Sequence, residues 1–155
     1  MEKTNAMRIL ERANVEMEVR TYEGGALSAV QVAAALSEDA ECVFKTLVAV
    51  GAPRKYYIFV IPAAAELDLK KAAKAVNEKS VQMLPQKELF PLTGYLHGGC
   101  SPFGMKKIFP TLFHSSAVGK KIFFSGGKIG VQIGALFEDV ARVLDCKTCD
   151  LIKES

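Results

Sequence analysis

Lys45 is the first residue that could do chemistry, because it is a charged residue within the mostly apolar residues 43–49. Strand alternation would place its side chain on the same face as those of Val43, Leu47 and Ala49. An ammonium group in such a row costs free energy unless it meets an anion. The alternative is a lysine at a sheet edge that extends its charged end into water. Lys45 is therefore a candidate for binding an anionic part of a substrate.

A glycine-rich loop is expected over residues 93–104. Its adjacent glycines, Gly98 and Gly99, permit positive φ and the close approach of a ligand to main-chain N–H groups. Such N–H groups can hold a carbonyl oxygen, an oxyanion or a phosphate. Ser101 and Pro102 stiffen the exit from the loop. A tight turn between two strands would use the same pair of glycines and remains the alternative.

A second glycine-rich turn covers residues 125–130. Ser125, Gly126 and Lys128 combine a hydroxyl group, backbone freedom and a cation there. The spacing differs from that of a phosphate-binding P-loop, G-x-x-x-x-G-K-[ST]. This turn is therefore a weaker candidate for an anion site than a P-loop would be.

Enzyme nucleophiles are poorly supported by the sequence. His97 and His114 are the only histidines, and no G-x-S-x-G elbow is present, which disfavours a serine hydrolase. Cys146 and Cys149 form one C-x-x-C without a second pair, so zinc binding or redox use is an alternative to ordinary packing thiols. Cys100 lies in the glycine loop, but no histidine is placed by sequence to activate it. We expect no metal and no cofactor.

Composition and charge restrict the class of protein. The 155 residues are 50% hydrophobic and 24% charged, which predicts one globular domain over residues 1–155 and excludes a disordered chain. No apolar run could span a membrane, no signal peptide is recognised, and the four cysteines are expected to be reduced, so a cytoplasmic protein is predicted. Residues 89–137 contain five lysines and no acidic residue, which suits a surface that faces phosphate. Five lysines are few for unaided binding to a nucleic acid, so a partner is expected.

The elements that must position these residues can be read from periodicity. Helical spacing and capping residues predict helices that begin after Thr4, Ser28 and Asp68, and a last helix that includes residues 136–144. A hairpin is expected from residues 42–50 and 55–61, and shorter strands from residues 17–22, near residue 81 and from residues 121–124. A helical turn should follow Pro85. This mixture without regular βαβ alternation predicts the α+β class, with a curled, mostly antiparallel or mixed sheet.

Four segments together resemble one known family: VFKTL at 43–47, LKKAA at 69–73, TGYLHGGCSPFG at 93–104 and SGG at 125–127. In this order they resemble the YbaK/EbsC branch of the prolyl-tRNA editing-domain superfamily, most closely the Cys-tRNA(Pro) deacylases. The resemblance covers residues 4–151. It implies a small domain with a mixed, barrel-like sheet flanked by helices, and a trans-editing enzyme that removes cysteine wrongly attached to proline tRNA.

The resemblance also implies a set of site residues. Lys45 would be the family's essential lysine beside the 3′ end of the substrate, and Gly98 and Gly99 would hold the carbonyl oxygen in the aminoacyl pocket. The substrate's own thiol would attack that carbonyl, which requires no enzyme nucleophile. Residues expected to bind the substrate are Tyr22, Ser28, Phe44, Ser101, Ser125, Gly126 and Gln132. Prolyl-tRNA synthetase is the expected protein partner.

The chain departs from the family pattern at two places. His97 and Cys100 stand where small aliphatic residues are usual, which changes the expected size and polarity of the pocket. Gly134 and Ala135 replace an acidic residue and a proline before the last helix. Three alternatives remain open: a deacylase of the same fold that acts on Ala-tRNA(Pro) or Ser-tRNA, a non-catalytic module that binds tRNA or a synthetase, and a thiol redox protein.

Overall fold

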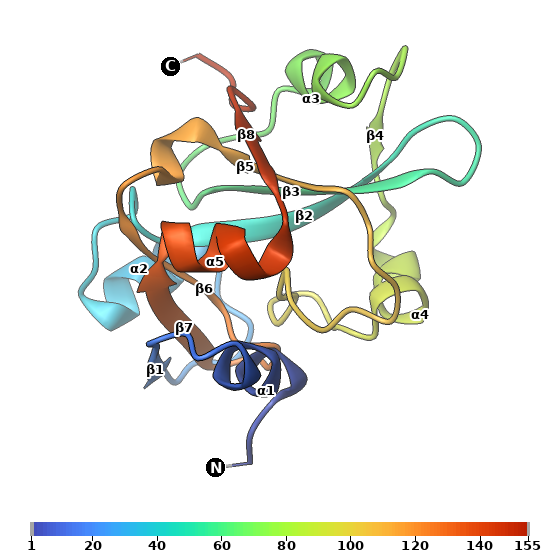
Figure 1. Ribbon diagram of the computed structural model, residues 1–155. Helices are drawn as coiled ribbons and strands as arrows, with labels where there is room; N and C mark the ends of the chain where they lie inside the picture. The colour runs from blue at the N-terminus through green and yellow to red at the C-terminus, as the bar shows by residue number, and fades with distance from the viewer. Residues whose placement is uncertain (1, 155) are drawn as a thin grey trace.

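The computed structural model describes residues 2–154, whose strands form two sheets (Figure 1). The three-stranded sheet is antiparallel and has the order β1-β7-β6. The five-stranded sheet has the order β4-β2-β3-β5-β8, and in it β5 runs parallel to both β3 and β8. The strand bounds are β1 Glu18–Thr21, β2 Phe44–Val50, β3 Tyr56–Pro62, β4 Gln82–Met83, β5 Thr111–His114, β6 Lys121–Ser125, β7 Val131–Leu136 and β8 Lys147–Cys149. The predicted α+β class and mixed sheet are confirmed.

The predicted helix starts are also confirmed, because each has a side chain that caps it. Thr4 accepts a hydrogen bond from the Met7 N–H at the start of α1 (Asn5–Arg12). Ser28 and Gln31 form a capping box at the start of α2 (Ala29–Leu36), as their spacing predicts. Asp68 accepts hydrogen bonds from two N–H groups of α3 (Leu69–Ala75). Short side-chain hydrogen bonds of this kind are local, so the sequence alone reveals them.

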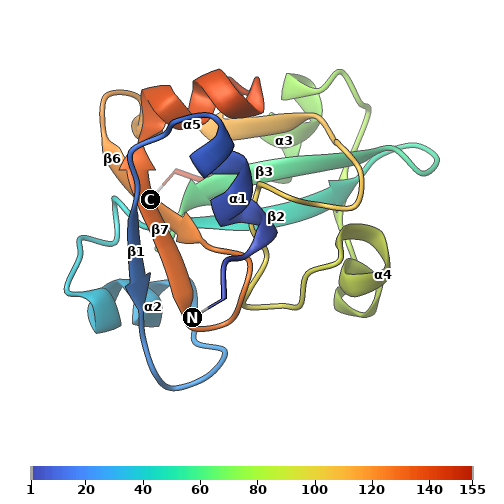
Figure 2. The same cartoon turned by 60° about the horizontal axis from the view of Figure 1, so that its bottom comes forward.

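The remaining helices frame the second half of the chain. A 3₁₀ turn, Gln86–Glu88, leads into α4 (Leu89–Thr93), and α5 spans Phe137–Leu144. Figure 2 shows α1 and α5 on one side of the molecule with α4 apart from them, and Figure 1 shows α4 near β4. Helices α1 and α5 cover a hydrophobic core cluster that contains residues of both sheets, among them Val60, Phe113 and Ile133. No helix among residues 2–154 is long and apolar enough to cross a membrane.

The two sheets meet where β2 begins. Val43 forms a parallel bridge with Phe123 of β6, and the Phe123 N–H donates to the Cys42 carbonyl at 2.8 Å. Strand pairing between the sheets stops there, so the two sheets are not closed into a barrel. Strand β4 pairs with β2 only at Ala49 and Val50. Among residues 2–154, the edge of β2 from Phe44 to Leu47 therefore has no strand paired with it.

Candidate active site

A cavity of about 360 Å³ lies along the open edge of β2. The cavity follows the edge of the strand. For this reason four successive residues of β2 line it, although neighbouring side chains in a strand point to opposite faces of the sheet. Residues of α2, α4, the glycine loop, β6 and β7 complete its wall. Seven of the ten residues predicted from the sequence line this cavity: Tyr22, Ser28, Phe44, Lys45, Gly98, Ser125 and Gln132. A cavity of this size suits a small ligand or part of a larger one.

Lys45 is half-buried in this cavity, opposite Ile61 in the β2–β3 hairpin. Its ammonium group has no carboxylate within 4 Å among residues 2–154. Burial lowers the pKa of this group, and the carboxylate of Glu66 opposes part of the shift. The strand pattern therefore predicted correctly that a lysine would lie among apolar side chains. An unpaired cation in a cavity is prepared to bind an anionic ligand.

Gly98 is the glycine of the adjacent pair that faces the cavity. Its φ of +89° is one that residues with a side chain rarely adopt, and a Cβ there would lie 3.1 Å from that of Ala26. No hydrogen bond from its N–H group is found among residues 2–154. Gly98 can therefore offer its N–H group to a ligand.

Gly99 has a different place from the one predicted. Its N–H group donates to the Leu96 carbonyl at 3.0 Å, which closes the turn. A Cβ at Gly99 would lie 3.0 Å from the backbone nitrogen of Ile129, so the residue lets the two glycine-rich turns touch. Because its N–H group is already bonded, the expected pair of donors to one carbonyl oxygen is reduced to Gly98 in this structure.

Ser101 and Gly126 also lie behind the cavity wall. The fully buried Ser101 accepts a hydrogen bond at its Oγ from the Phe103 N–H. Gly126 donates its N–H to Val131 in the β6–β7 turn, where a Cβ would meet the Val131 side chain at 2.8 Å. Both residues, like Gly99, shape the loops that support the cavity. The structure does not bring these three to its wall.

Two residues of the cavity wall have a buried side-chain oxygen without a hydrogen-bond partner among residues 2–154: Thr46 Oγ1 and Gln132 Oε1. Buried polar atoms are normally hydrogen-bonded, so an unpaired pair in one cavity points to a ligand that bonds them. Gln132 was expected from the sequence, whereas Thr46 was missed. The available signal was a hydroxyl group next to Lys45 in an apolar strand. Leu27, Val32 and Leu89 supply apolar walls around these groups.

Cys100 lines the cavity but is not activated. It is 9% exposed, and burial raises the pKa of its thiol to about 12, so the thiol is protonated at neutral pH. None of the hydrogen bonds among residues 2–154 joins it to His97, which also lines the cavity, or to His114. A thiol needs an activating neighbour or a lowered pKa to act as a nucleophile. Cys100 is therefore a wall residue with a small, apolar character.

The C-x-x-C cysteines are separate packing thiols. Cys146 packs against the core cluster beneath α1 and α5, and Cys149 against a second cluster next to α3. Burial raises the pKa of Cys146 to about 11 and also raises that of Cys149. Within residues 2–154, no three His, Cys, Asp or Glu side chains lie close enough together to hold a metal ion. The redox alternative therefore loses its structural support.

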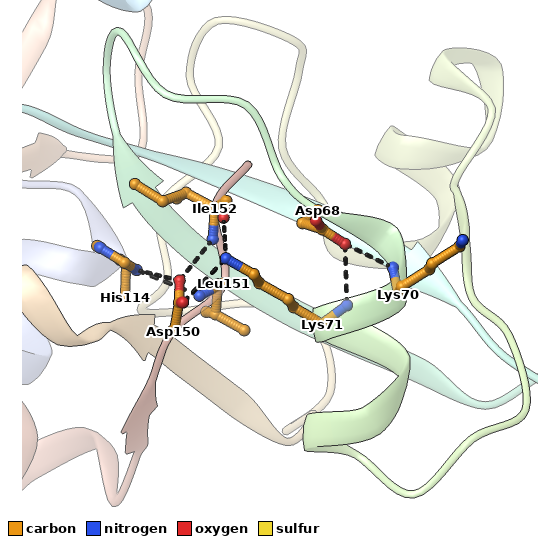
Figure 3. Close-up of polar contacts among 7 residues, drawn as sticks. All are labelled: Asp68, Lys70, Lys71, His114, Asp150, Leu151 and Ile152. Carbon is orange, nitrogen blue, oxygen red and sulfur yellow. Dashed lines mark hydrogen bonds and ion pairs between the residues drawn. The ribbon is translucent and has the colours of Figure 1, made fainter. Parts of the chain in front are cut away.

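A larger cavity of about 950 Å³ lies near the C-terminal segment, where Figure 3 shows the polar contacts of Lys71, His114 and Asp150. Its central polar groups are already paired: Lys71 Nζ bonds Asp150 at 2.9 Å and the Ile152 carbonyl at 2.7 Å. His114 Nδ1 accepts a hydrogen bond from the Leu151 N–H. Four carboxylates line this cavity, those of Glu41, Glu66, Asp150 and Glu154, against two lysines, Lys71 and Lys153, so its lining has a net negative charge. These negative charges repel an anionic substrate, so the smaller cavity is the better candidate for one.

Comparison with known proteins identifies the family of this chain. The aminoacyl-tRNA editing domain family matches residues 23–147, a range that includes every residue of the 360 Å³ cavity except Tyr22. EbsC of Enterococcus faecalis (strain ATCC 700802 / V583), a candidate Cys-tRNA(Pro)/Cys-tRNA(Cys) deacylase, is 48% identical over 136 residues, which cover 85% of this chain and 82% of EbsC.

Solved structures show the same fold. The crystal structure of a candidate trans-editing enzyme for prolyl-tRNA synthetase superposes with a TM-score of 0.86 at 23% identity, covering 99% of this chain and 100% of that one. The hypothetical protein APE2540 superposes with a TM-score of 0.89 at 16% identity, covering 97% and 100%. The predicted resemblance and the predicted class of enzyme, an aminoacyl-tRNA deacylase, are confirmed. The chain belongs to the aminoacyl-tRNA editing domain family.

Proposed function

We propose that this protein removes cysteine from wrongly charged Cys-tRNA(Pro), as a free-standing editing enzyme. The observation that carries the proposal is the cavity itself. It brings the unpaired cation of Lys45, the free N–H of Gly98 and two unpaired polar atoms around a small space, with no activated nucleophile. The relationship to EbsC, whose name includes Cys-tRNA(Pro), supports the substrate.

In the proposed complex, Lys45 binds the terminal ribose-phosphate and the Gly98 N–H donates to the ester carbonyl oxygen. The hydroxyl oxygen of Thr46 and the amide oxygen of Gln132 accept hydrogen bonds from the α-ammonium group of cysteine. Donors fixed around a carbonyl stabilise the negative charge that develops there during attack. Fixed geometry also brings the substrate thiol and carbonyl together, which lowers the entropic part of the barrier.

The chemical step is intramolecular. The substrate's sulfur forms a bond to its own carbonyl carbon, and the bond from that carbon to the ribose oxygen breaks. The products are a cyclic four-membered thioester and free tRNA, and the thiol proton moves to the departing ribose hydroxyl. Atoms and charge balance without an enzyme nucleophile, in agreement with the raised pKa of Cys100.

A deacylation panel tests the proposal. Proline tRNA and cysteine tRNA, each carrying cysteine, and proline tRNA carrying alanine, serine or proline, are incubated with the protein, and released amino acid is measured. Release of cysteine alone supports thiol attack. Release of alanine or serine at a similar rate contradicts it, because these amino acids lack a thiol and need water as the nucleophile. Binding without any release would favour a non-catalytic tRNA-binding module.

We also propose prolyl-tRNA synthetase as a partner. Residues 89–137 carry only five lysines, a modest contribution to tRNA affinity. A synthetase that already holds the tRNA would supply the remaining affinity and the choice of tRNA. Repeating the panel with the synthetase should then lower the KM for Cys-tRNA(Pro) and leave that for Cys-tRNA(Cys) unchanged. Equal KM values with and without the synthetase would contradict the partnership.

A further inference from the structure

Three exposed residues are close in sequence or space to the cavity wall: Phe90 with Lys106 over its ring, and Leu96 next to His97, here called the α4 rim. Phe90 is 52% exposed and Leu96 is 58% exposed, which is unusual for large apolar side chains. Each follows or precedes a residue of the cavity wall, since Leu89 and His97 both line it. The rim therefore adjoins the cavity. Figures 1 and 2 show that α4 stands at the margin of the molecule, beside β4 and apart from the other helices.

The rim combines an aromatic ring with a cation. Lys106 Nζ lies 5.4 Å from the centroid of the Phe90 ring and bonds the Pro91 carbonyl at 3.4 Å. The backbone N–H of Lys106 donates to Thr93 at 3.1 Å, which holds the loop against α4. Proteins that bind single-stranded nucleic acids place aromatic rings for the bases next to cations for the phosphates. The absence of acidic residues from 89–137 adds charge complementarity.

The size of the cavity also indicates that RNA contacts the α4 rim. A space of about 360 Å³ accommodates an amino acid and part of the terminal nucleoside, but no further nucleotides. The nucleotides that precede the terminal adenosine must therefore cross the surface beside the cavity. Leu89 and His97 form one side of the cavity wall. The surface next to that side is the α4 rim.

We propose that the α4 rim binds the unpaired 3′-terminal nucleotides of the tRNA, with a base stacked on Phe90 and a phosphate at Lys106. This inference rests on the proposed function and extends it from the aminoacyl group to the RNA. The rival occupant is a protein surface of the synthetase, which would use the same exposed apolar side chains.

The test compares two substrates, full-length Cys-tRNA(Pro) and the short cysteinyl ester of adenosine. Phe90→Ala should reduce the preference for the full-length substrate, measured as the ratio of kcat/KM values, by about 5- to 150-fold. The second measurement is binding to an RNA oligonucleotide that ends in ACCA and carries no amino acid. Lys106→Gln should reduce the slope of log Kd against log salt for this RNA by about 0.7. Val118→Ala and Lys147→Gln are matched controls, because both side chains are exposed and lie outside the rim. Thermal melting verifies that every variant is folded.

The outcomes separate the two proposals. If the parent protein cleaves neither substrate, the proposed function fails. If it cleaves both and Phe90→Ala keeps the parental preference, the rim proposal alone is overturned. The rim proposal is also overturned if the variants bind the oligonucleotide normally and lose only the stimulation by synthetase. Oligonucleotide binding is measured without catalysis, so the rim can be judged even where turnover is absent.

Discussion

Replacing Lys45 by methionine should make the protein more stable and much less active at the same time. The side chain is half-buried, and its ammonium group has no carboxylate within 4 Å among the described residues. Methionine is also unbranched, but it ends in a methyl group at the position of the lysine Cε and has no ammonium group. A half-buried cation that binds a substrate, and has no structural partner, lowers the free energy of unfolding of the free protein. The variant removes this cost.

The size of the gain follows from the group that is exchanged. One buried methyl-sized group contributes about 0.8 kcal/mol to the free energy of unfolding. For a chain of 155 residues, 1 kcal/mol shifts Tm by about 2 to 4 °C, so we expect Lys45→Met to melt about 2 to 3 °C higher. Loss of a hydrogen bond to a charged group should lower kcat/KM for charged tRNA at least about tenfold.

The difference in stability should also depend on pH. Burial lowers the pKa of Lys45 below the ordinary 10.5, so the unfolded chain binds this proton more tightly than the native protein does. The cost of the charge is then full below the native pKa and disappears as the pH rises towards 10.5. The melting temperatures of the parent and Lys45→Met should therefore differ most near neutral pH, and the difference should narrow in alkali.

Differential scanning calorimetry at several pH values measures this effect, together with deacylation of Cys-tRNA(Pro). Lys147→Met is the matched control, since Lys147 is exposed on β8, and its stability should change by less than about 0.5 kcal/mol. A Lys45→Met protein that melts several degrees lower and still clears Cys-tRNA(Pro) would refute the reasoning, because the lysine would then be structural.

Three further predictions concern the pocket and the C-terminal segment. Cys100→Ser should retain deacylase activity within about threefold, because the thiol with a pKa of about 12 is not the nucleophile; complete loss in the same assay would show that it is. Gly98→Ala should cost about 1 to 2 kcal/mol in denaturant unfolding, since alanine disfavours a φ of +89° and its Cβ would meet Ala26; unchanged stability would contradict this. Burial lowers the pKa of His114, so stability should fall as the pH drops below 6.5, and His114→Gln, measured by urea unfolding, should reduce that dependence; an identical pH profile would exclude His114 as the cause.

Local signals explain why so much of the first half of the chain could be predicted. Thr4, Ser28 and Asp68 act within three residues of themselves, and the hairpin of β2 and β3 needs only a short turn. Strands β5, β7 and β8 were not assigned individually from the sequence. β5 is four buried residues without alternation and pairs in parallel with β3 and β8, which are remote in the chain. β7 contains Gly134, which weakens a strand pattern and is explained only by the Phe123 ring that lies against it.

The candidate site, too, could be predicted from local patterns only in part. The pattern around Lys45 indicated an unusual lysine from the residues alone, whereas its position beside Gly98 was implied only by the family resemblance. The role of Gly99 could not be predicted from the sequence, because only the structure shows that its N–H donates to the Leu96 carbonyl. Thr46 was missed for a related reason. An unpaired hydroxyl group can be recognised only when all its neighbours are known.

The cavity takes its walls from both sheets, with Lys45 and Thr46 on β2 and Ser125 and Gln132 on β6 and β7. A ligand that fills the cavity would thus contact both sheets and hold them together. Ligands that bind only the native state raise its stability in proportion to the logarithm of their concentration. A shift in melting temperature with a non-reactive analogue of cysteinyl-adenosine would then reveal occupancy of the pocket without any charged RNA, and would offer a simple way to rank amino acids by fit.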